Sequence, residues 1–83
     1  MSKILVEVYL PVLHQSFDVY IPLTMQLHSV EPLLLKAIQE VTNGYYDYAQ
    51  QAVICDRDTG EILDINQTAL ELSLQNGSRL MII

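Results

Sequence analysis

The chain has 83 residues, enough for one domain with one hydrophobic core but not for two. Hydrophobic residues make up 51% of the chain, which argues against intrinsic disorder. Ten acidic and four scattered basic residues give a net charge of −6. Nucleic acid and anionic membrane surfaces bind clustered cations, so both are poor partners for this chain. The small size favours a binding module over an enzyme, and we expect its partner to be a protein.

The sequence also carries information about the compartment. The single cysteine, Cys55, excludes an internal disulfide scaffold and fits a reducing environment. The first residues lack the long uncharged run of a signal peptide, and no stretch approaches the roughly 18 apolar residues of a membrane span. These features predict a cytoplasmic protein that does not insert directly into a membrane.

The first two expected elements are strands at residues 4–10 and 17–21. Both alternate in side-chain character and are rich in β-branched and aromatic residues. Pro11 and Pro22 end them, because proline has no N–H to donate to a strand ladder. The link between them is short, so the pair is predicted to be an antiparallel hairpin.

Residues 28–43 have the period of an amphipathic helix. We expect Ser29 to be the N-cap, with Thr24 as an earlier alternative, and Pro32 to lie in the first turn. Asn43–Gly44 supplies a left-handed stop after the last turn. The apolar positions fall at offsets 0, 3, 4, 7, 8 and 11 from the first of them: Val30, Leu33, Leu34, Ala37, Ile38 and Val41.

The remaining elements are short. We expect strands at 52–55, 61–63 and 79–83, a turn at 56–60 between the first two, and one helical turn within 68–74. The first and last strands are rich in Ile, Val and Leu, as central strands should be. We therefore expect the last strand to lie beside the first and parallel to it.

This order of elements predicts a two-layer α+β domain, in which one helix covers one face of a sheet. The expected core is made of the inward positions of each element: Ile4, Val6, Val8, Leu10, Phe17, Val19, Ile21, Val30, Leu33, Leu34, Ile38, Val41, Ile54, Leu70, Leu74, Leu80 and Ile82.

The element order resembles that of a ubiquitin-like β-grasp protein over nearly the whole chain. The most specific part is the run 70–80, LELSLQNGSRL, because ubiquitin-like domains often end in a leucine, a short helical turn, a small polar turn and a final strand. Among such proteins the chain most resembles the YukD/EsaB family, which is encoded with bacterial type VII (WXG100) secretion machinery. The resemblance implies a single ubiquitin-like domain over residues 1–83, with a mixed sheet of four to five strands and one main helix. It also implies a cytoplasmic accessory or regulatory component that acts by non-covalent binding.

The C-terminal residues bear on two alternatives. Conjugated ubiquitin-like proteins and sulfur carriers end in a flexible Gly-Gly tail, whereas residues 80–83 belong to the last expected strand. Conjugation and sulfur transfer are therefore not expected. The alternatives are an orphan ubiquitin-like adaptor of another bacterial assembly, or a sulfur carrier or modifier whose Gly-Gly tail is missing.

No catalytic, cofactor or metal site is expected. One turn carries three acidic residues: Asp56, Asp58 and Glu61. We interpret it as a solvated turn, since an EF-hand loop needs more ligands at wider spacing. His14 and His28 are interpreted as polar loop residues, and Cys55 as an ordinary strand cysteine, because neighbouring Asp56 disfavours a thiolate.

The helix can cover only one face of the sheet, so the other face is the predicted binding surface. Apolar side chains are unusual on a solvated strand face and often mark a partner site. The predicted partner-binding residues on that face are Leu5, Tyr9, Tyr20, Met81 and Ile83, with Glu7 and Asp18 among or beside them. A second candidate is the tyrosine cluster Tyr45, Tyr46 and Tyr48. In solution we expect a monomer or a weak homodimer.

Overall fold

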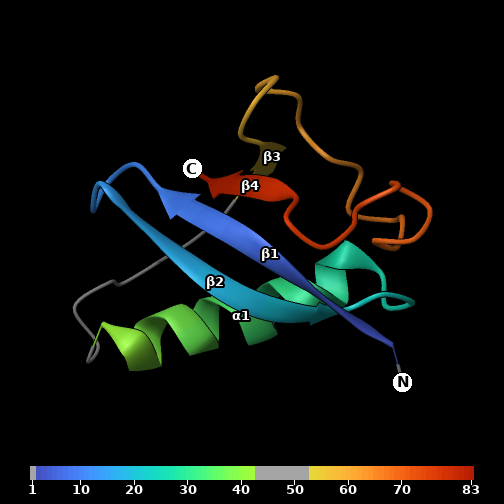
Figure 1. The fold of residues 1–83 in the computed structure, drawn as a ribbon, viewed down its shortest axis with the longest axis horizontal. Coiled ribbons are helices and arrows are strands. Elements are labelled where there is room, and N and C mark those ends of the chain that lie inside the picture. The colour runs from blue at the N-terminus through green and yellow to red at the C-terminus, as the bar shows by residue number, and fades with distance from the viewer. Residues whose placement is uncertain (1, 43–52) are drawn as a thin grey trace.

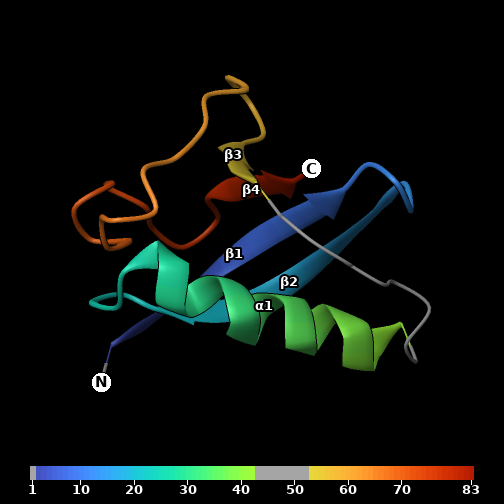
Figure 2. The same ribbon diagram turned by 180° about the vertical axis from the view of Figure 1, so that it is seen from behind.

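The computed structural model describes residues 2–42 and 53–83. Its elements are β1 (Lys3–Leu10), β2 (Gln15–Pro22), α1 (Leu27–Val41), β3 (Ile54–Asp56) and β4 (Arg79–Ile82). The strands form one mixed sheet in the order β2-β1-β4-β3, and α1 crosses one face of it (Figure 1, Figure 2). The predicted α+β architecture, with one main helix on a mixed sheet of four to five strands, is confirmed, and the sheet of the described residues has four.

The hairpin forms as predicted, with strands slightly longer than the pattern suggested. β1 and β2 pair antiparallel from Lys3 opposite Pro22 to Leu10 opposite Gln15. The turn between them ends at His14, whose φ of 52° lies in the left-handed region. β1 stops immediately before Pro11 and β2 ends on Pro22, as expected from the missing proline N–H.

β4 lies between β1 and β3 at the centre of the sheet. It pairs parallel with β1, as predicted, and antiparallel with β3. The expected strand at 61–63 is reduced to one isolated bridge between Cys55 and Ile62. The chain turns away directly afterwards, because the Asp64 carboxylate accepts a bond from the backbone N–H of Asn66 at 2.9 Å.

The N-terminus of α1 differs from the prediction. The N-cap is Gln26, and no side chain among the described residues caps the helix. Instead, the N–H groups of Leu27 and His28 donate to backbone carbonyls of Gln67 and Ile65, each at 3.0 Å. The expected cap, Ser29, therefore lies inside the helix. The loop at 65–67 supplies the acceptors that a cap side chain would otherwise provide.

Pro32 also lies deeper in the helix than expected. It is the sixth residue of α1, so its missing N–H falls where a bond to the carbonyl of His28 would form. At the other end, the hydroxyl of Thr42 donates to the carbonyl of Ile38 at 3.0 Å. The expected stop at Asn43–Gly44 lies outside the described residues.

The expected helical turn within 68–74 is present as a single turn. The N–H of Leu72 donates to the carbonyl of Thr68 at 3.0 Å. Thr68 and Glu71 form a reciprocal capping box, with bonds of 2.9 and 3.1 Å between each side chain and the other's N–H.

In residues 2–42 and 53–83, no helix has both the length and the apolar run needed to cross a membrane.

Most of the predicted core is confirmed. These residues are buried: Ile4, Val6, Val8, Leu10, Ile21, Val30, Leu34, Ile38, Ile54, Leu80 and Ile82. Phe17, Val19 and Leu74 are partly buried against this core. The prediction missed Leu27, Leu35, Cys55 and Ala69, which are also buried.

Three predicted core residues are exposed: Leu33, Val41 and Leu70. Apolar residues cover more than half of the circumference of α1, and the sequence pattern did not distinguish which part faces the sheet. The structure buries Leu27, Val30, Leu34, Leu35 and Ile38, which leaves Leu33 and Val41 on one flank of the helix. Leu70 points outward because its neighbour Ala69 fills the core from the same turn.

Candidate partner-binding surfaces

The open face of the sheet carries the five predicted partner-binding residues, but its register separates them. Leu5 lies opposite Tyr20, and Tyr9 lies opposite Met81. A polar row lies between these two pairs: Glu7, with Asp18 on one side and Arg79 on the other. The predicted patch is thus two apolar areas, one with Leu5 and Tyr20 and one with Tyr9, Met81 and the exposed Ile83.

Arg57 covers part of the middle of this face. Its Nη1 donates to Oε1 of Glu7 at 2.6 Å, and it lies 3.3 Å from Oγ of Ser16. Its guanidinium carbon lies 4.1 Å above the ring centroid of Tyr9, a cation–π distance. Tyr9 is therefore half-buried and only partly available to a partner. The sequence placed Arg57 in a turn and gave no sign that it reaches across to β1.

A second ion pair borders the same face. Arg79 donates to Oδ1 of Asp58 through both Nε and Nη2. The hydrogen bond and then the charge of Asp58 raise the pKa of Arg79 above its usual value, so the guanidinium stays protonated. Two arginines and their acidic partners thus make this face more polar than alternation alone suggested.

The acidic turn is built by backbone bonding. Oδ1 of Asp56 accepts the N–H groups of Asp58 and Thr59, at 2.8 and 3.1 Å, and Gly60 adopts a φ of 78°. Within residues 2–42 and 53–83, no three His, Cys, Asp or Glu side chains are placed to hold a metal ion.

The remaining candidates lie apart. His14 is at the tip of the hairpin and His28 at the start of α1, at opposite ends of the molecule (Figure 1). His28 lies 2.8 Å from Oε1 of Gln26 through Nε2 and 3.3 Å from Oγ of Ser29 through Nδ1. This chain of contacts is exposed, and Gln26 takes the place of the carboxylate that orients the histidine in a catalytic triad. Cys55 is buried, and Tyr45, Tyr46 and Tyr48 lie outside the described residues.

A groove between β2 and α1 is the surface that the sequence interpretation missed. One hollow of about 450 Å³ is lined on the strand side by residues 16–20 and on the helix side by Ala37, Ile38 and Val41. A second hollow, of about 170 Å³, shares Val19, Tyr20 and Ala37 with the first and continues to Leu33. Together they form one groove along the length of β2, which we call the β2–α1 groove.

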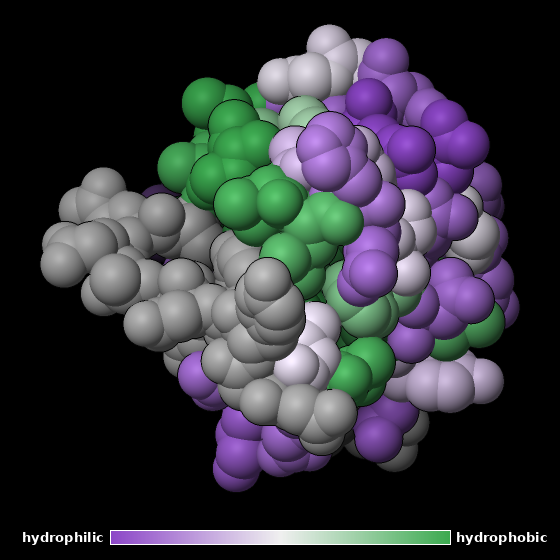
Figure 3. Space-filling view, turned by 90° about the vertical axis from the view of Figure 1, so that its left-hand side faces the viewer, coloured by the Kyte–Doolittle hydropathy of each residue, from purple (hydrophilic) through white to green (hydrophobic). Residues whose placement is uncertain are grey.

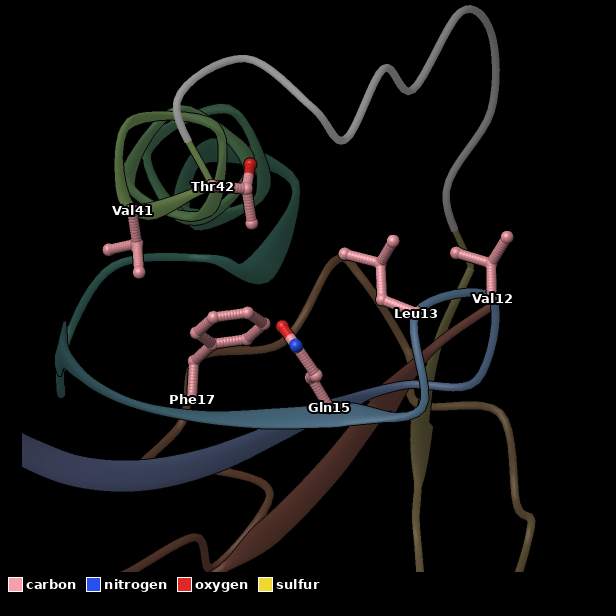
Figure 4. A pocket seen from close by; sticks show the side chains of 6 residues that line it. All are labelled: Val12, Leu13, Gln15, Phe17, Val41 and Thr42. Carbon is pink, nitrogen blue, oxygen red and sulfur yellow. The ribbon is translucent and has the colours of Figure 1, made fainter.

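The groove continues toward the tip of the hairpin. A hollow of about 540 Å³ there shares Phe17 and Val41 with it, and these two side chains point toward each other from strand and helix (Figure 4). Figure 3 looks onto this end of the molecule and shows a continuous area of hydrophobic side chains there. The spacing of Leu33, Ala37 and Val41, four residues apart, was the sequence signal for this surface, but the sequence interpretation assigned Leu33 and Val41 to the core.

Comparison with known proteins identifies the fold. No family model matches the sequence, and no curated protein matches it either. Among solved structures, the ubiquitin-like domain of the Mycobacterium tuberculosis type VII secretion system protein EccD1 matches with a TM-score of 0.79 and 14% identity. The match covers 100% of this chain and 99% of that one.

Two further structures match as well. The EccD5 ubiquitin-like domain from Mycobacterium xenopi has a TM-score of 0.82 and 17% identity, covering 100% of this chain and 94% of that one. A chain of the MycP5-free ESX-5 inner membrane complex has a TM-score of 0.82 and 19% identity, covering 100% of this chain and 21% of that one. The chain therefore has the ubiquitin-like β-grasp fold.

Proposed function

We propose that this protein is a non-enzymatic ubiquitin-like interaction module of the YukD/EsaB type, and that it acts by non-covalent binding as a cytoplasmic accessory or regulatory component of a type VII secretion system. The supporting observation is the end-to-end likeness to the ubiquitin-like domains of EccD1 and EccD5. These two domains come from type VII secretion proteins and have nearly the same length as this chain.

The chemistry of the described residues supports binding over catalysis. Several polar side chains are engaged in ion pairs or turn contacts, such as Arg57 with Glu7 and Asp56 with its own turn. The one Ser–His contact, between Ser29 and His28, is exposed and borders none of the three hollows described above. An interaction surface needs complementary shape and charge, and the open sheet face and the β2–α1 groove offer candidates for such a surface.

Deletion of the gene in its native host tests the secretion role. We expect less WXG100 protein in the culture supernatant at unchanged cellular amounts, measured by quantitative mass spectrometry, with recovery when the wild-type gene is restored. A Leu34→Asp variant, which should not fold, is the matched negative control for rescue. Unchanged secretion would contradict the proposal and favour an adaptor of another assembly.

The non-covalent mode has its own test. We expect the protein isolated from its host to have the mass of its unmodified chain, and to co-purify with secretion components that detach under denaturing conditions. A covalent adduct or thiocarboxylate at the C-terminus would instead support the modifier or sulfur-carrier alternative.

A further inference from the structure

Within residues 2–42 and 53–83, the outer edge of β2 presents backbone groups that have no hydrogen-bond partner. The N–H of Leu23 donates to the carbonyl of Ser2 at 3.0 Å and continues the β1–β2 register by one pair. Bonded pairs alternate along an antiparallel ladder, so Phe17, Val19 and Ile21 direct their backbone groups toward β1. The intervening residues Ser16, Asp18 and Tyr20 therefore direct theirs outward. β2 is the edge strand of the sheet formed by the described residues.

The other side of β1 supports this assignment. Glu7 donates its N–H to Ser78, and Leu5 accepts the N–H of Gly77, both at 2.9 Å. Odd-numbered residues of β1 thus bond toward β4, which leaves its even-numbered residues to bond β2. An edge with free N–H and C=O groups is a template for one more strand.

The groove beside this edge is apolar. Side chains of a strand added to β2 would alternate, and those opposite Phe17 and Val19 would enter the β2–α1 groove. There they would contact the helix flank formed by Leu33, Ala37 and Val41. Leu33 is 53% exposed and Val41 is 66% exposed, so the flank is open to receive them.

The charge of Asp18 indicates which kind of segment would bind at this edge. Asp18 lies opposite Glu7 across the β1–β2 pair, and Glu7 is already paired with Arg57. Asp18 is exposed and forms no ion pair within residues 2–42 and 53–83. A second copy would bring another net charge of −6 and another Asp18 to the seam, whereas a cationic side chain opposite Asp18 would compensate it.

We propose that the β2–α1 groove binds an extended segment of a partner protein, which adds as a strand to the edge of β2. The segment places small apolar side chains in the groove at alternate positions and a lysine or arginine opposite Asp18. This inference deepens the proposed binding function, on which it rests, but it is independent of the secretion context.

A synthetic peptide tests the proposal with the whole protein. The probe is the acetylated and amidated sequence TVTVKVT, titrated into the isotope-labelled chain and followed by amide NMR. We expect saturable shifts at the Asp18 and Tyr20 amides with slowed hydrogen exchange, and methyl shifts at Val41. Saturable shifts confined to the open sheet face, or none at up to about 5 mM peptide, would overturn the proposal.

Two control peptides separate strand pairing from general attraction. TVTVEVT keeps the alternation but reverses the charge, and we expect at least about fivefold weaker binding to the wild-type chain. VVVKTTT keeps the composition of the probe but loses the alternation, and it should bind more weakly still. Equal affinity for all three peptides would contradict the proposed pairing.

Matched variants locate the site. Val41→Lys adds a charge to the groove, and Ile62→Lys adds one at a position with the same exposure of 66% outside it. We expect only Val41→Lys to weaken probe binding. Asp18→Lys should reverse the preference between TVTVKVT and TVTVEVT, and an unchanged preference would refute the role of Asp18. If groove variants still joined a secretion complex at full strength, the groove would be excluded as the binding site, but the proposed function would remain intact.

Discussion

At the scale of single residues, two adjacent leucines of α1 show how the helix is oriented. Leu34 is 2% exposed and lies in the core, whereas Leu33 is 53% exposed beside the groove. We expect Leu34→Asp to unfold the domain, because it buries a charge without a partner, and Leu33→Asp to leave it folded. Thermal unfolding followed by circular dichroism measures both. Equal melting temperatures for the two variants would show that the helix face is misassigned.

Arg57 is the residue whose role the sequence predicted least. It contacts Glu7 and Tyr9 of β1 and Ser16 of β2, whereas Arg79 pairs with exposed Asp58. We expect Arg57→Ala to lower the free energy of unfolding by about 1–2 kcal/mol, since it removes a partly exposed ion pair and a cation–π contact. Arg79→Ala should lower it by less than Arg57→Ala does, because the ion pair of Arg79 with Asp58 is exposed to solvent. Urea denaturation measures both, and the reverse order would contradict this account.

At the scale of elements, the start of α1 shows how a distant loop replaces a local signal. Carbonyls of Ile65 and Gln67 accept the first helical N–H groups, so the hydroxyl of Ser29 is not needed as a cap. We expect Ser29→Ala to change the free energy of unfolding by less than about 0.5 kcal/mol, against about 1 kcal/mol for a true N-cap. A loss of 1 kcal/mol or more would restore Ser29 as the cap.

Pro32 gives the opposite expectation in the same helix. It occupies an interior position, and alanine there would restore a bond to the carbonyl of His28. The gain is reduced because proline also restricts the unfolded chain. We therefore expect Pro32→Ala to raise the free energy of unfolding by about 1–2 kcal/mol, measured by urea denaturation. A destabilised variant would mean that the helix begins later than described.

The elements also show why the sequence predicted some features and missed others. Strict alternation in β1 and β2 leaves one choice of buried face, and the expected residues are buried: Ile4, Val6, Val8, Leu10 and Ile21. The wide apolar face of α1 allows several orientations, so Leu33 and Val41 were assigned to the core and the β2–α1 groove was missed. The open-face residues Leu5, Tyr9, Tyr20, Met81 and Ile83 follow from alternation, but the contacts of Arg57 depend on tertiary structure.

At the scale of the whole molecule, the order of the strands follows from composition. β1 and β4 are the most apolar strands, and both are central, although they lie at opposite ends of the sequence. The isolated bridge at Ile62 is too small a feature for pattern alone to distinguish from a strand. Composition therefore predicts the order of the strands better than it predicts the length of the shortest elements.

The central position of β4 makes the last residues indispensable to the fold. β4 joins β1 to β3, and its Leu80 and Ile82 are almost fully buried. Their burial contributes about 3–6 kcal/mol, which is comparable to the total stability of a small domain. We expect the chain truncated after Ser78 to be unfolded, with collapsed amide dispersion in its NMR spectrum.

Removal of Ile83 alone is the matched control. Ile83 is exposed and exchanges two backbone bonds of 3.0 Å with Val53 at the end of the β3–β4 pair. Loss of those two bonds costs about 1–3 kcal/mol, so the shortened chain should stay folded with a lower melting temperature. A truncated 1–78 chain that kept its native amide dispersion would show that β1, β2 and α1 fold without β4. In that case β1, β2 and α1 would close a core of their own without Leu80 and Ile82. The C-terminal strand would then be an addition to a stable hairpin–helix unit.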